Sequence, residues 1–526
     1  MSALTLLSRI FGFVRDLLVA KLFGATMLAD AFYVAFRVPN LLRSLVAEGA
    51  LSAAFVPLLS ARLVKGHSEA KQALREVAGF LLVATAVLSA LGILYAPEII
   101  SVLAPGFLNN PGKTDVCIKL TRIMMPYILF VSMVAMLNGA LNSVKIFGAA
   151  AWAQVLMNIT LIVGALLAAL FNGVHAVEVL SWSVIVGGIV QVIAQFPALK
   201  RAGFLIWPHF RLFSSNISEL LRLMLPAIFG ATVYQLSIFI NTLFASLLPD
   251  GSVSWLFYAD RLTQLPIGIF SIALASVLLP ALSHAAAKED HHEFSSHLVD
   301  SLRYTSFIII PLSALIFHFA EPLIAVMFER GAFTEHDSQM TAVAVCALSL
   351  GLWSASCQSL VARAFMARRS TWVPTFVGIG SLAVGAPLAL MLMGPAQTND
   401  SSNLAAFVYY VQSALPSMQF DLRHAGLGIA SSLASLIAFI LLLKILTSKI
   451  ALNLSAFVAC TIKTLLASIL TIWALRALEL KGQTHFLLLA HGAIGSAAIL
   501  GMLYLFRSLE LKEVLVLCNR LFHKQR

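Results

Sequence analysis

The feature that most constrains this chain is a succession of apolar stretches that runs almost from end to end. A helix needs about 20 apolar residues to cross the hydrocarbon core of a bilayer. We find about fourteen stretches of that length, from residues 3–23 to residues 485–507. Hydrophobic residues make up 60% of the 526 and charged residues 11%, which excludes a soluble domain of ordinary composition. The sequence therefore predicts an all-α polytopic membrane protein.

Lys and Arg are distributed unevenly among the loops between these stretches. One alternating set of loops holds most of them, including Lys65 and Lys200, whereas the other set holds Asp115 and Asp250. Cytoplasmic loops of membrane proteins are enriched in Lys and Arg, so we expect the basic set, and both termini, to be cytoplasmic. The net charge of +11 then reflects topology in a plasma membrane, and no nucleic acid partner is expected.

An internal repeat is visible at an offset of about 224 residues. ALSAAFVPLLSA from Ala50 matches ALASVLLPALSH from Ala273, FYVAFR echoes FYADR, and GALNSVK echoes RAFMARR. Transporters are commonly built from two related halves. We expect two pseudo-symmetric six-helix bundles followed by two accessory transmembrane helices and a basic cytoplasmic tail. The expected ranges are 1–200, 201–452 with a long outer loop at 395–422 that contains a short interfacial helix, and 453–526.

The first two apolar stretches carry an unusual number of charges: Arg9, Arg15, Asp16, Lys21, Asp30, Arg37, Arg43 and Glu48. A charge near the bilayer centre costs on the order of 3 kcal/mol, so these side chains are expected to face a protein-lined interior. Gly12 and Pro39 lie between the charges and are expected to break or kink the helices there. Asp260 and Arg261 would add the second half's contribution to the same interior.

Basic residues in this set outnumber acidic ones by five to three, which leaves room for an anionic ligand. Guanidinium groups bind phosphate oxygens bidentately, so a lipid-linked diphosphate sugar fits the interior. The predicted substrate-binding residues are Arg9, Arg15, Arg37, Arg43 and Arg261, and the predicted charge-pairing or gating residues are Asp16, Asp30, Glu48 and Asp260. We expect Asp30 and Glu48 to pair with arginines when no ligand is bound. The alternative is an ion-pair network that only holds helices together.

Other chemistries have weaker support. The string GFLNNPGKT from Gly106 resembles a phosphate loop, but its spacing is one residue too long and no strand precedes it. The five cysteines show no metal-ligand or redox spacing, so neither a metal nor a cofactor is expected. A cation-coupled drug exporter would present acids to its substrates, and a non-transporting scaffold would not need buried charges. We expect a transporter rather than an enzyme.

The motifs SRIFGFVRD, ADAFYVAFRVPNLLRSLVAEGALSAAFVPLL and GSVSWLFYADRL resemble the MurJ (MviN) family of lipid II flippases, within the multidrug/oligosaccharidyl-lipid/polysaccharide exporter superfamily. The resemblance implies alternating-access transport of lipid II, an undecaprenyl-diphosphate-linked disaccharide pentapeptide, from the cytoplasmic to the outer leaflet. It also implies essential arginines at Arg9, Arg15, Arg43 and Arg261 and an essential acid at Asp30.

The implied partners are lipid II, the lipids of the bacterial inner membrane and, loosely, the machinery of cell-wall synthesis. Some relatives place an acid for sodium in the eleventh span, but residues 371–394 contain none, so no such site is expected. A flippase for another polyprenyl-diphosphate glycan stays open, because its diphosphate presents the same chemistry.

Overall fold

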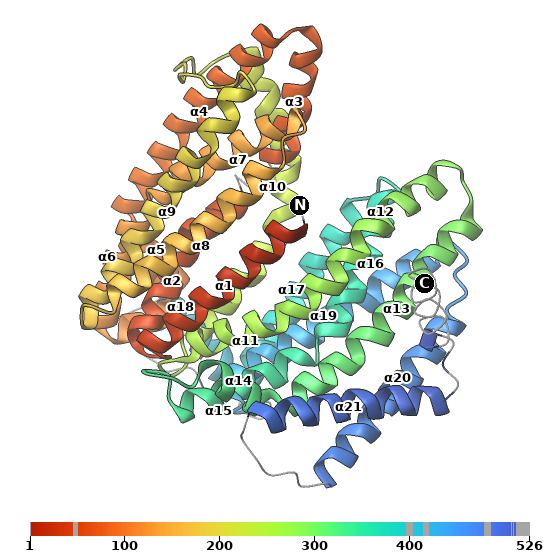
Figure 1. Ribbon diagram of the computed structural model, residues 1–526. Coiled ribbons are helices and arrows are strands. Elements are labelled where there is room, and N and C mark those ends of the chain that lie inside the picture. The colour runs from red at the N-terminus through yellow and green to blue at the C-terminus, as the bar shows by residue number, and fades with distance from the viewer. Residues whose placement is uncertain are drawn as a thin grey trace. The chain divides into compact units, whose positions relative to one another are not determined.

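The computed structural model describes residues 2–45, 51–395, 403–413, 420–477, 485–506, 508 and 510–511. Within these ranges the chain is helical, and its one β-type contact is an isolated bridge between Met393 and Asp421. The chain divides into two compact units, which we describe one at a time (Figure 1). The prediction of an all-α architecture is confirmed.

Unit 1 comprises Met1–Ser254 together with two short segments, Arg330–Thr334 and Ala396–Ala414. Its core lies where α3, α4 and α7 pack together, with Phe55, Leu74 and Met136 buried among them. Its helices are α1 (Ser2–Phe23), α2 (Met27–Leu42), α3 (Ser52–Lys65), α4 (His67–Leu94), α5 (Ala96–Leu103), the 3₁₀ helix η2 (Pro105–Asn109), α6 (Pro111–Met124), α7 (Tyr127–Ser143), α8 (Gly148–Ala168), α9 (Gly173–Arg201), α10 (Ser215–Ser246) and α18 (Asn403–Ser413).

Unit 2 comprises the remaining segments, Trp255–Glu329, Glu335–Pro395 and Leu415–Arg526. Its main core is formed by α12, α13, α16 and α19, and α20 packs against both α13 and α21. Its helices are α11 (Ser252–Pro266, whose first turn belongs to unit 1), the π-helical segment η3 (Ile267–Ser271), α12 (Ile272–Ala287), α13 (His291–His318), α14 (Ala320–Phe328), α15 (Glu335–Ser349), α16 (Leu352–Ala367), α17 (Trp372–Leu392), α19 (Arg423–Thr447), α20 (Ser455–Ala477) and α21 (His485–Leu505).

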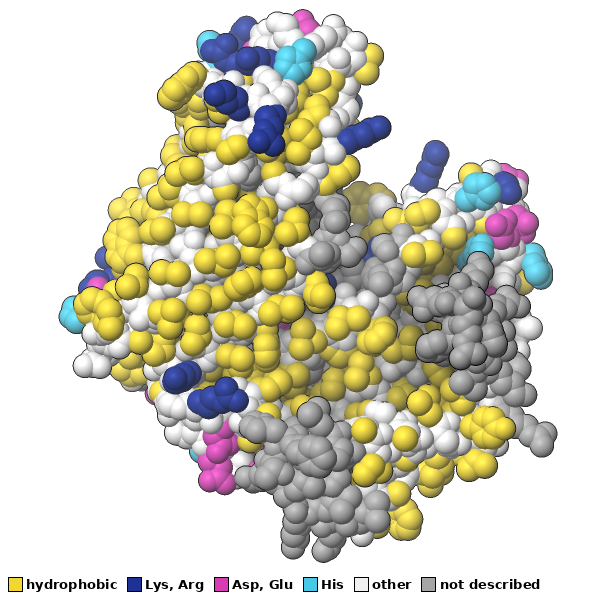
Figure 2. Space-filling model, in the orientation of Figure 1, with side chains coloured by type: hydrophobic (Ala, Val, Ile, Leu, Met, Phe, Trp, Pro, Cys, Tyr) yellow, Lys and Arg dark blue, Asp and Glu magenta, His cyan; other side chains and the backbone are white. Residues whose placement is uncertain are grey.

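Eight helices in the described part of the chain are long and apolar enough to cross a membrane, or nine if the bent pair α15–α16 is one span. Over unit 1, hydrophobic side chains cover the lengths of the helices, and Lys and Arg gather mainly near their ends (Figure 2). The prediction of a multi-pass membrane protein is confirmed. The number fourteen stays a prediction, because α1 carries several charges and α2–α3 and α11–α12 are interrupted helices.

The internal repeat is confirmed by the helix boundaries. α4 begins at His67 and α13 at His291, 224 positions later, and the same offset separates the starts of α8 and α17. Two non-glycine residues with left-handed backbone, Lys145 (φ 61°) and Arg369 (φ 57°), are also 224 positions apart. π-helical turns occur at residues 43–45 and again from Ile267. Each half therefore repeats the same order of helices and breaks.

The compact units differ from the expected boundary at residue 200. α10 begins the second repeat but packs against α3, α4 and η2, so unit 1 extends to Ser254. The helix expected in the 395–422 loop is confirmed as α18, which packs against η2 and also belongs to unit 1. Segments of the second repeat thus contribute to the first unit.

The predicted helix breaks at Gly12 and Pro39 are wrong, whereas the predicted kink at Pro39 stays a prediction. α1 continues through Gly12, where an added Cβ would meet only the Asn158 side chain at 3.6 Å or more. α2 likewise continues through Pro39 to Leu42 and changes to π geometry at residues 43–45. Pro39 removes only the bond that its N–H would donate to the Ala35 carbonyl, and the helix continues past it to the π-helical turn.

The contact between α8 and α9 depends on Gly164, because a Cβ added there would overlap the side chain of Ser183. We expect G164A to destabilise the protein by about 1–3 kcal/mol through overpacking, visible as a lower thermal denaturation midpoint in detergent. Gly148, in the first turn of the same helix, has open space around its Cβ position, so G148A is the matched control. Equal midpoints for the two variants would contradict this packing.

Glu510 fixes the segment that follows α21 to α13. Its carboxylate accepts hydrogen bonds from Arg303 Nε (2.9 Å) and Ser508 Oγ (2.7 Å). Burial acts to raise the pKa of Glu510, but the bonds from Ser508 and Arg303 outweigh it and hold this pKa below its ordinary value. The stabilisation is therefore present above the ordinary glutamate pKa, about 4.3, and is lost as the pH falls through the lowered value.

We expect the thermal midpoint of the wild-type protein to fall more steeply below about pH 4.3 than that of E510Q, which lacks this ionisation. At neutral pH the wild type should be the more stable of the two, because the glutamine cannot neutralise Arg303. Parallel midpoint curves for the two proteins across this range would show that the pair contributes no pH dependence.

Candidate functional site

Arg15 is held between α1 and α8. Its guanidinium donates to Asp16 Oδ1 through Nη2 (2.7 Å) and Nε (2.9 Å), and to Asn158 Oδ1 through Nη1 (3.0 Å). Asp16 is buried, whereas the Arg15 side chain keeps 17% of its surface exposed. Arg15 is thus oriented by its neighbours while part of it stays open to a ligand.

The other predicted basic residues of unit 1 lie along α1 and α2. Arg37 donates to Thr242 on α10, and Arg43 Nε donates to Asn40 Oδ1 (2.6 Å) in the turn before it. Arg9 is half-buried and makes no ion pair with any residue that the structure describes. The arginines therefore lie in the predicted helices, and the bonds of Arg15, Arg37 and Arg43 go to α8, α10 and α2 respectively.

In unit 2, Arg261 lies in α11 with its guanidinium carbon 4.6 Å from the centre of the Phe257 ring, one turn earlier. Such cation–π contact stabilises a half-buried arginine without neutralising it. Its neighbour Asp260 accepts a hydrogen bond from Gln264 one turn later. Glu48 lies outside the described residues.

Asp30 is a buried carboxylate that accepts four hydrogen bonds. Its carboxylate is 1% exposed and accepts from Lys113 Nζ (2.8 Å), Gly251 N (2.8 Å), Ser254 N (2.9 Å) and Ser254 Oγ (2.6 Å). The prediction that Asp30 pairs with an arginine is wrong in this structure, because its cationic partner is Lys113. The N–H groups that it accepts from belong to the start of α11, so Asp30 caps that helix from outside.

Lys113 lies two residues before Asp115, in one of the predicted outer loops, and no role was expected for it. It lies in the first turn of α6, where Asn110 accepts from its backbone N–H and Pro111 starts the helix. A cation is unfavourable at this end of a helix, so two carboxylates, Asp30 and the exposed Asp250 (2.7 Å), compensate it. The available signal was a lysine in the first turn of a helix that directly follows Pro111.

The corresponding position of the second repeat is also charged and buried. Asp337 lies 224 positions after Lys113, in the first turn of α15, and accepts from Trp255 Nε1 (3.0 Å) at the start of α11. The Trp255 ring is 5.0 Å from that of buried His424, whose Nε2 contacts the Met340 carbonyl (2.8 Å). In both repeats, therefore, a charged residue at this helix start contacts the start of a neighbouring helix.

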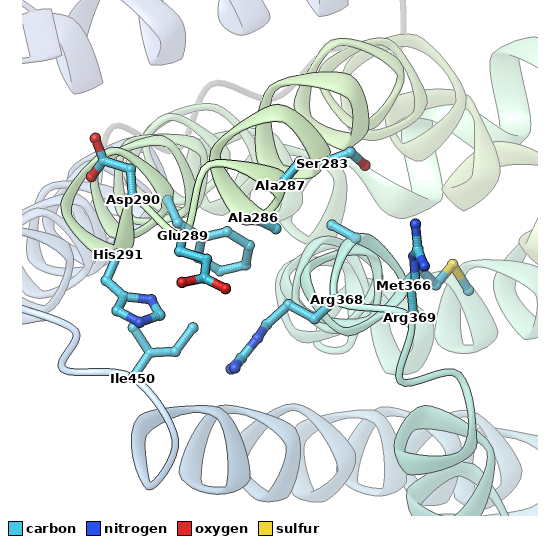
Figure 3. Close-up of a pocket in the computed structure, with 12 residues that line it drawn as sticks. Ser283, Ala286, Ala287, Glu289, Asp290, His291, Met366, Arg368, Arg369 and Ile450 are labelled. Carbon is cyan, nitrogen blue, oxygen red and sulfur yellow. The ribbon is translucent and has the colours of Figure 1, made fainter.

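A cavity of about 710 Å³ lies at one end of unit 2, between the α12–α13 and α16–α17 turns (Figure 3). Glu289, His291 and Arg368 point toward it, and Asp290 turns away because it caps α13 by accepting from Glu293 N (2.9 Å). None of the predicted site residues lines it. In the described part of the chain, His, Cys, Asp and Glu form no group of three that could hold a metal ion.

The structure thus brings together Arg15 with Asp16, and Asp30 with Lys113, within unit 1. The predicted cavity lined by all five arginines would require both halves, and it stays a prediction. What the geometry offers chemically is a set of permanently charged, partly oriented guanidinium groups in apolar helices. That set suits an anionic ligand with several phosphate oxygens.

Comparison with known proteins gives a consistent result. The family described as "Lipid II flippase MurJ" matches residues 19–495. A "Lipid II flippase MurJ" of Burkholderia cenocepacia is 40% identical over 391 residues, covering 73% of this chain and 75% of the relative. A "Probable lipid II flippase MurJ" of Buchnera aphidicola subsp. Acyrthosiphon pisum is 36% identical over 442 residues, covering 84% and 81%.

Solved structures share the fold. The structure titled "Lipid II flippase MurJ, inward closed conformation" has a TM-score of 0.79 at 24% identity and covers 98% of this chain and 99% of that one. An inward-facing multidrug resistance MATE family transporter of the MOP superfamily has a TM-score of 0.65 at 15% identity, covering 90% and 96%. On the extent of the family match and the identity to curated relatives, the chain belongs to the MurJ family of lipid II flippases.

Proposed function

We propose that this protein is a lipid II flippase, which moves the undecaprenyl-diphosphate-linked disaccharide pentapeptide from the cytoplasmic to the outer leaflet. The observation that carries the proposal is family membership together with arginines retained in apolar helices, where an unneutralised charge is costly. Basic residues outnumber acidic ones by five to three in the first two apolar stretches, and a diphosphate would supply further negative charge there. The transported headgroup is polar and bulky, which explains why the helices that bind it are not simply hydrophobic.

Arg15 is the residue best prepared for the diphosphate. Asp16 and Asn158 fix its guanidinium, so little rotamer freedom is lost on binding, and its exposed part can donate to phosphate oxygens. Arg9, Arg37, Arg43 and Arg261 would complete the site, with Asp16, Asp30, Glu48 and Asp260 as its charge-pairing and gating residues. In this arrangement Asp16 keeps Arg15 oriented while the diphosphate adds negative charge to the site.

We infer that the charge of the site differs between the loaded and the empty state of an alternating-access cycle. With the diphosphate bound, the arginines are neutralised while the inner gate closes and the outer gate opens, and after its release the acids partly compensate them during the return. Each elementary charge that crosses the field is worth about 2.3 kcal/mol per 100 mV. A net positive empty site therefore makes the membrane potential a driving force for one half of the cycle.

The proposal also implies the membrane in which the protein lies, its topology and its partners. The protein would lie in a bacterial plasma membrane, the inner membrane of a Gram-negative cell, with both termini and the basic loops in the cytoplasm. Its partners would be lipid II and membrane lipids, with a loose association with the enzymes of cell-wall synthesis. It needs no cofactor for this transport, because the substrate's own charge and the membrane field supply the required interactions.

Two alternatives belong to different substrate classes. A flippase for another polyprenyl-diphosphate glycan would use the same arginines, and the relatives' names favour lipid II over it. A cation-coupled drug exporter shares the fold, as the similarity to the MATE family transporter indicates. It would need acids that face a cationic drug, whereas Asp16 and Asp30 are buried and occupied by Arg15 and Lys113.

We expect R15A and R261A each to reduce lipid II translocation by about 10–100-fold, because a hydrogen bond to a charged group is worth about 1.5–3 kcal/mol. R15K should restore it only in part, since an ammonium group cannot form the bidentate contact. The measurement is growth of a strain depleted of its own lipid II flippase, together with the amount of lipid II exposed on the outer surface.

The matched control is R122A on α6, because Arg122 is exposed and donates only to the Ile93 carbonyl among the described residues. Immunoblots of the membrane fraction establish that each variant is inserted. Full complementation by both R15A and R261A would refute the assignment of these residues to the substrate site. Complementation by the wild-type chain of a different glycan flippase, but not of lipid II transport, would refute the substrate itself.

A further inference from the structure

The cavity in unit 2 lies at a place where the second repeat differs from the first. It is bounded by the turn that joins α12 to α13 and by the turn that joins α16 to α17 (Figure 3). Its volume of about 710 Å³ falls within the range of small-molecule sites, about 300–1,000 Å³. None of the residues proposed for lipid II transport lines it. A ligand of this cavity would therefore occupy a site separate from the proposed arginine site.

In unit 1 an aromatic side chain covers the equivalent place. Phe204, three residues after the end of α9, is fully buried and stacks on His67, the first residue of α4, with ring centres 4.8 Å apart. The matching residues of unit 2 are Ile450, three residues after the end of α19, and His291, the first residue of α13. Isoleucine has no ring to stack on the histidine, and both residues line the cavity. The second repeat therefore keeps open a position that the first repeat closes.

The turns around the cavity carry charges that differ from those of the first repeat. α3 and α4 are joined by Gly66 alone, whereas α12 and α13 are joined by residues 288–290, which include Glu289. On the other wall, Arg368 occupies the position that Val144 has in the first repeat, 224 positions earlier. Glu289 and Arg368 point toward the cavity, and neither forms an ion pair with any residue that the structure describes (Figure 3). The cavity thus has one acidic and one basic wall.

The surroundings of the cavity favour a membrane lipid over a soluble molecule. Both turns belong to the basic set of loops expected on the cytoplasmic side. Three residues after Arg369, which lines the cavity, α17 starts with Trp372. The Trp372 side chain is 64% exposed, and its ring stacks on that of Phe376 with 5.9 Å between centres. Tryptophan is enriched where a bilayer meets water, so we expect the cavity to lie at the level of the lipid headgroups.

We propose that this cavity binds the headgroup of an ethanolamine phospholipid from the cytoplasmic leaflet. The phosphate accepts hydrogen bonds from Arg368, with Arg369 adding positive charge beside it, and the primary ammonium donates to Glu289. The acyl chains leave the cavity over α17, because only 11% of its apolar window is buried inside the protein. The inference goes beyond lipid II transport and does not depend on it.

The opposed charges determine which headgroup fits. The phosphate of phosphatidylglycerol would meet Arg368, but this headgroup has no cation for Glu289. The quaternary ammonium of phosphatidylcholine has a charge but no N–H to donate to the carboxylate. A primary ammonium neutralises Glu289 and donates to it, so the ethanolamine headgroup matches both walls.

The test measures lipid binding to the purified full-length protein by native mass spectrometry. Delipidated protein in detergent is titrated with phosphatidylethanolamine, phosphatidylglycerol or phosphatidylcholine, all with the same acyl chains. The variants are R368Q, E289Q and A287W, the last of which fills the cavity from an exposed position in its lining. The controls are R201Q and E69Q in unit 1, because Arg201 and Glu69 are exposed and form no ion pair with any described residue.

We expect the wild-type protein to bind phosphatidylethanolamine about tenfold more tightly than the other two lipids. R368Q should weaken this binding by about tenfold or more, because a hydrogen bond between charged groups is lost. E289Q should lower the affinity for phosphatidylethanolamine to that for phosphatidylglycerol, without weakening the binding of phosphatidylglycerol. A287W should weaken the binding of phosphatidylethanolamine as well, and neither control should change it.

A cysteine in the cavity tests whether the lipid binds there. Ser283 is exposed and lines the cavity, so S283C should react with a water-soluble maleimide, and labelling of the parent chain is subtracted. Phosphatidylethanolamine should slow this labelling more than the other two lipids do. The soluble headgroup, O-phosphoethanolamine, should not slow it at the same concentration, because it lacks the acyl chains that lie on α17.

Three results would overturn the proposal. Equal affinity of the wild-type protein for the three lipids would remove the role assigned to Glu289. Unchanged phosphatidylethanolamine binding in R368Q, E289Q and A287W would show that the lipid binds elsewhere. Protection of S283C by O-phosphoethanolamine as effective as that by the lipid would assign the cavity to a soluble ligand instead.

Discussion

Neutralising charges inside apolar helices is the constraint on which this structure depends. A lone charge in a low-dielectric interior is costly enough that it must find a partner, reach water or await a ligand. At Asp30 the charge has found partners: the carboxylate accepts hydrogen bonds from Lys113 and from the N–H groups at the start of α11. Arg15 is an intermediate case: Asp16 and Asn158 bind its guanidinium, but part of the side chain stays exposed. The difference separates structural charge from charge that is available to a substrate.

The repeat explains how one chain can provide both. Helices recur at an offset of 224, yet the same position holds Asp30 in one repeat and Ser254 in the other, and Lys113 in one and Asp337 in the other. Duplicated backbone geometry thus carries unlike side chains. Asp30 and Ser254 occupy equivalent positions of the two repeats and are hydrogen-bonded to each other. Two aspartates at these positions would repel each other instead.

The architecture could largely be read from the sequence, because apolar length and offset similarity are strong, local signals. Pro57 and Pro280 marked the repeat, and their helices α3 and α12 occupy matching places in the order. The boundary between the two units was less predictable, because α10 belongs to the second repeat but packs against α3 and α4 of the first. Helix breaks were misplaced because a glycine or proline in a long apolar helix is often tolerated, as at Gly12 and Pro39.

The sequence predicted which charged residues lie in the apolar helices, but not which of them bind to each other. Charge in apolar stretches pointed to Asp30, but its partner lies 83 residues away on another helix, and no spacing rule reaches so far. The sequence around Lys113, GFLNNPGKT, resembles a phosphate loop and is rich in polar residues, so it predicted a loop. Only the fold shows that this string starts a helix beside α2.

The most direct measurement of the central claim is lipid II translocation by the purified protein in liposomes that contain no other protein. Labelled lipid II is placed in both leaflets, and an enzyme that cleaves its exposed headgroup is added outside. We predict that cleavage passes the outer-leaflet fraction and proceeds toward completion when the protein is present. Cleavage that stops at the outer-leaflet fraction, as in protein-free liposomes, would contradict the account.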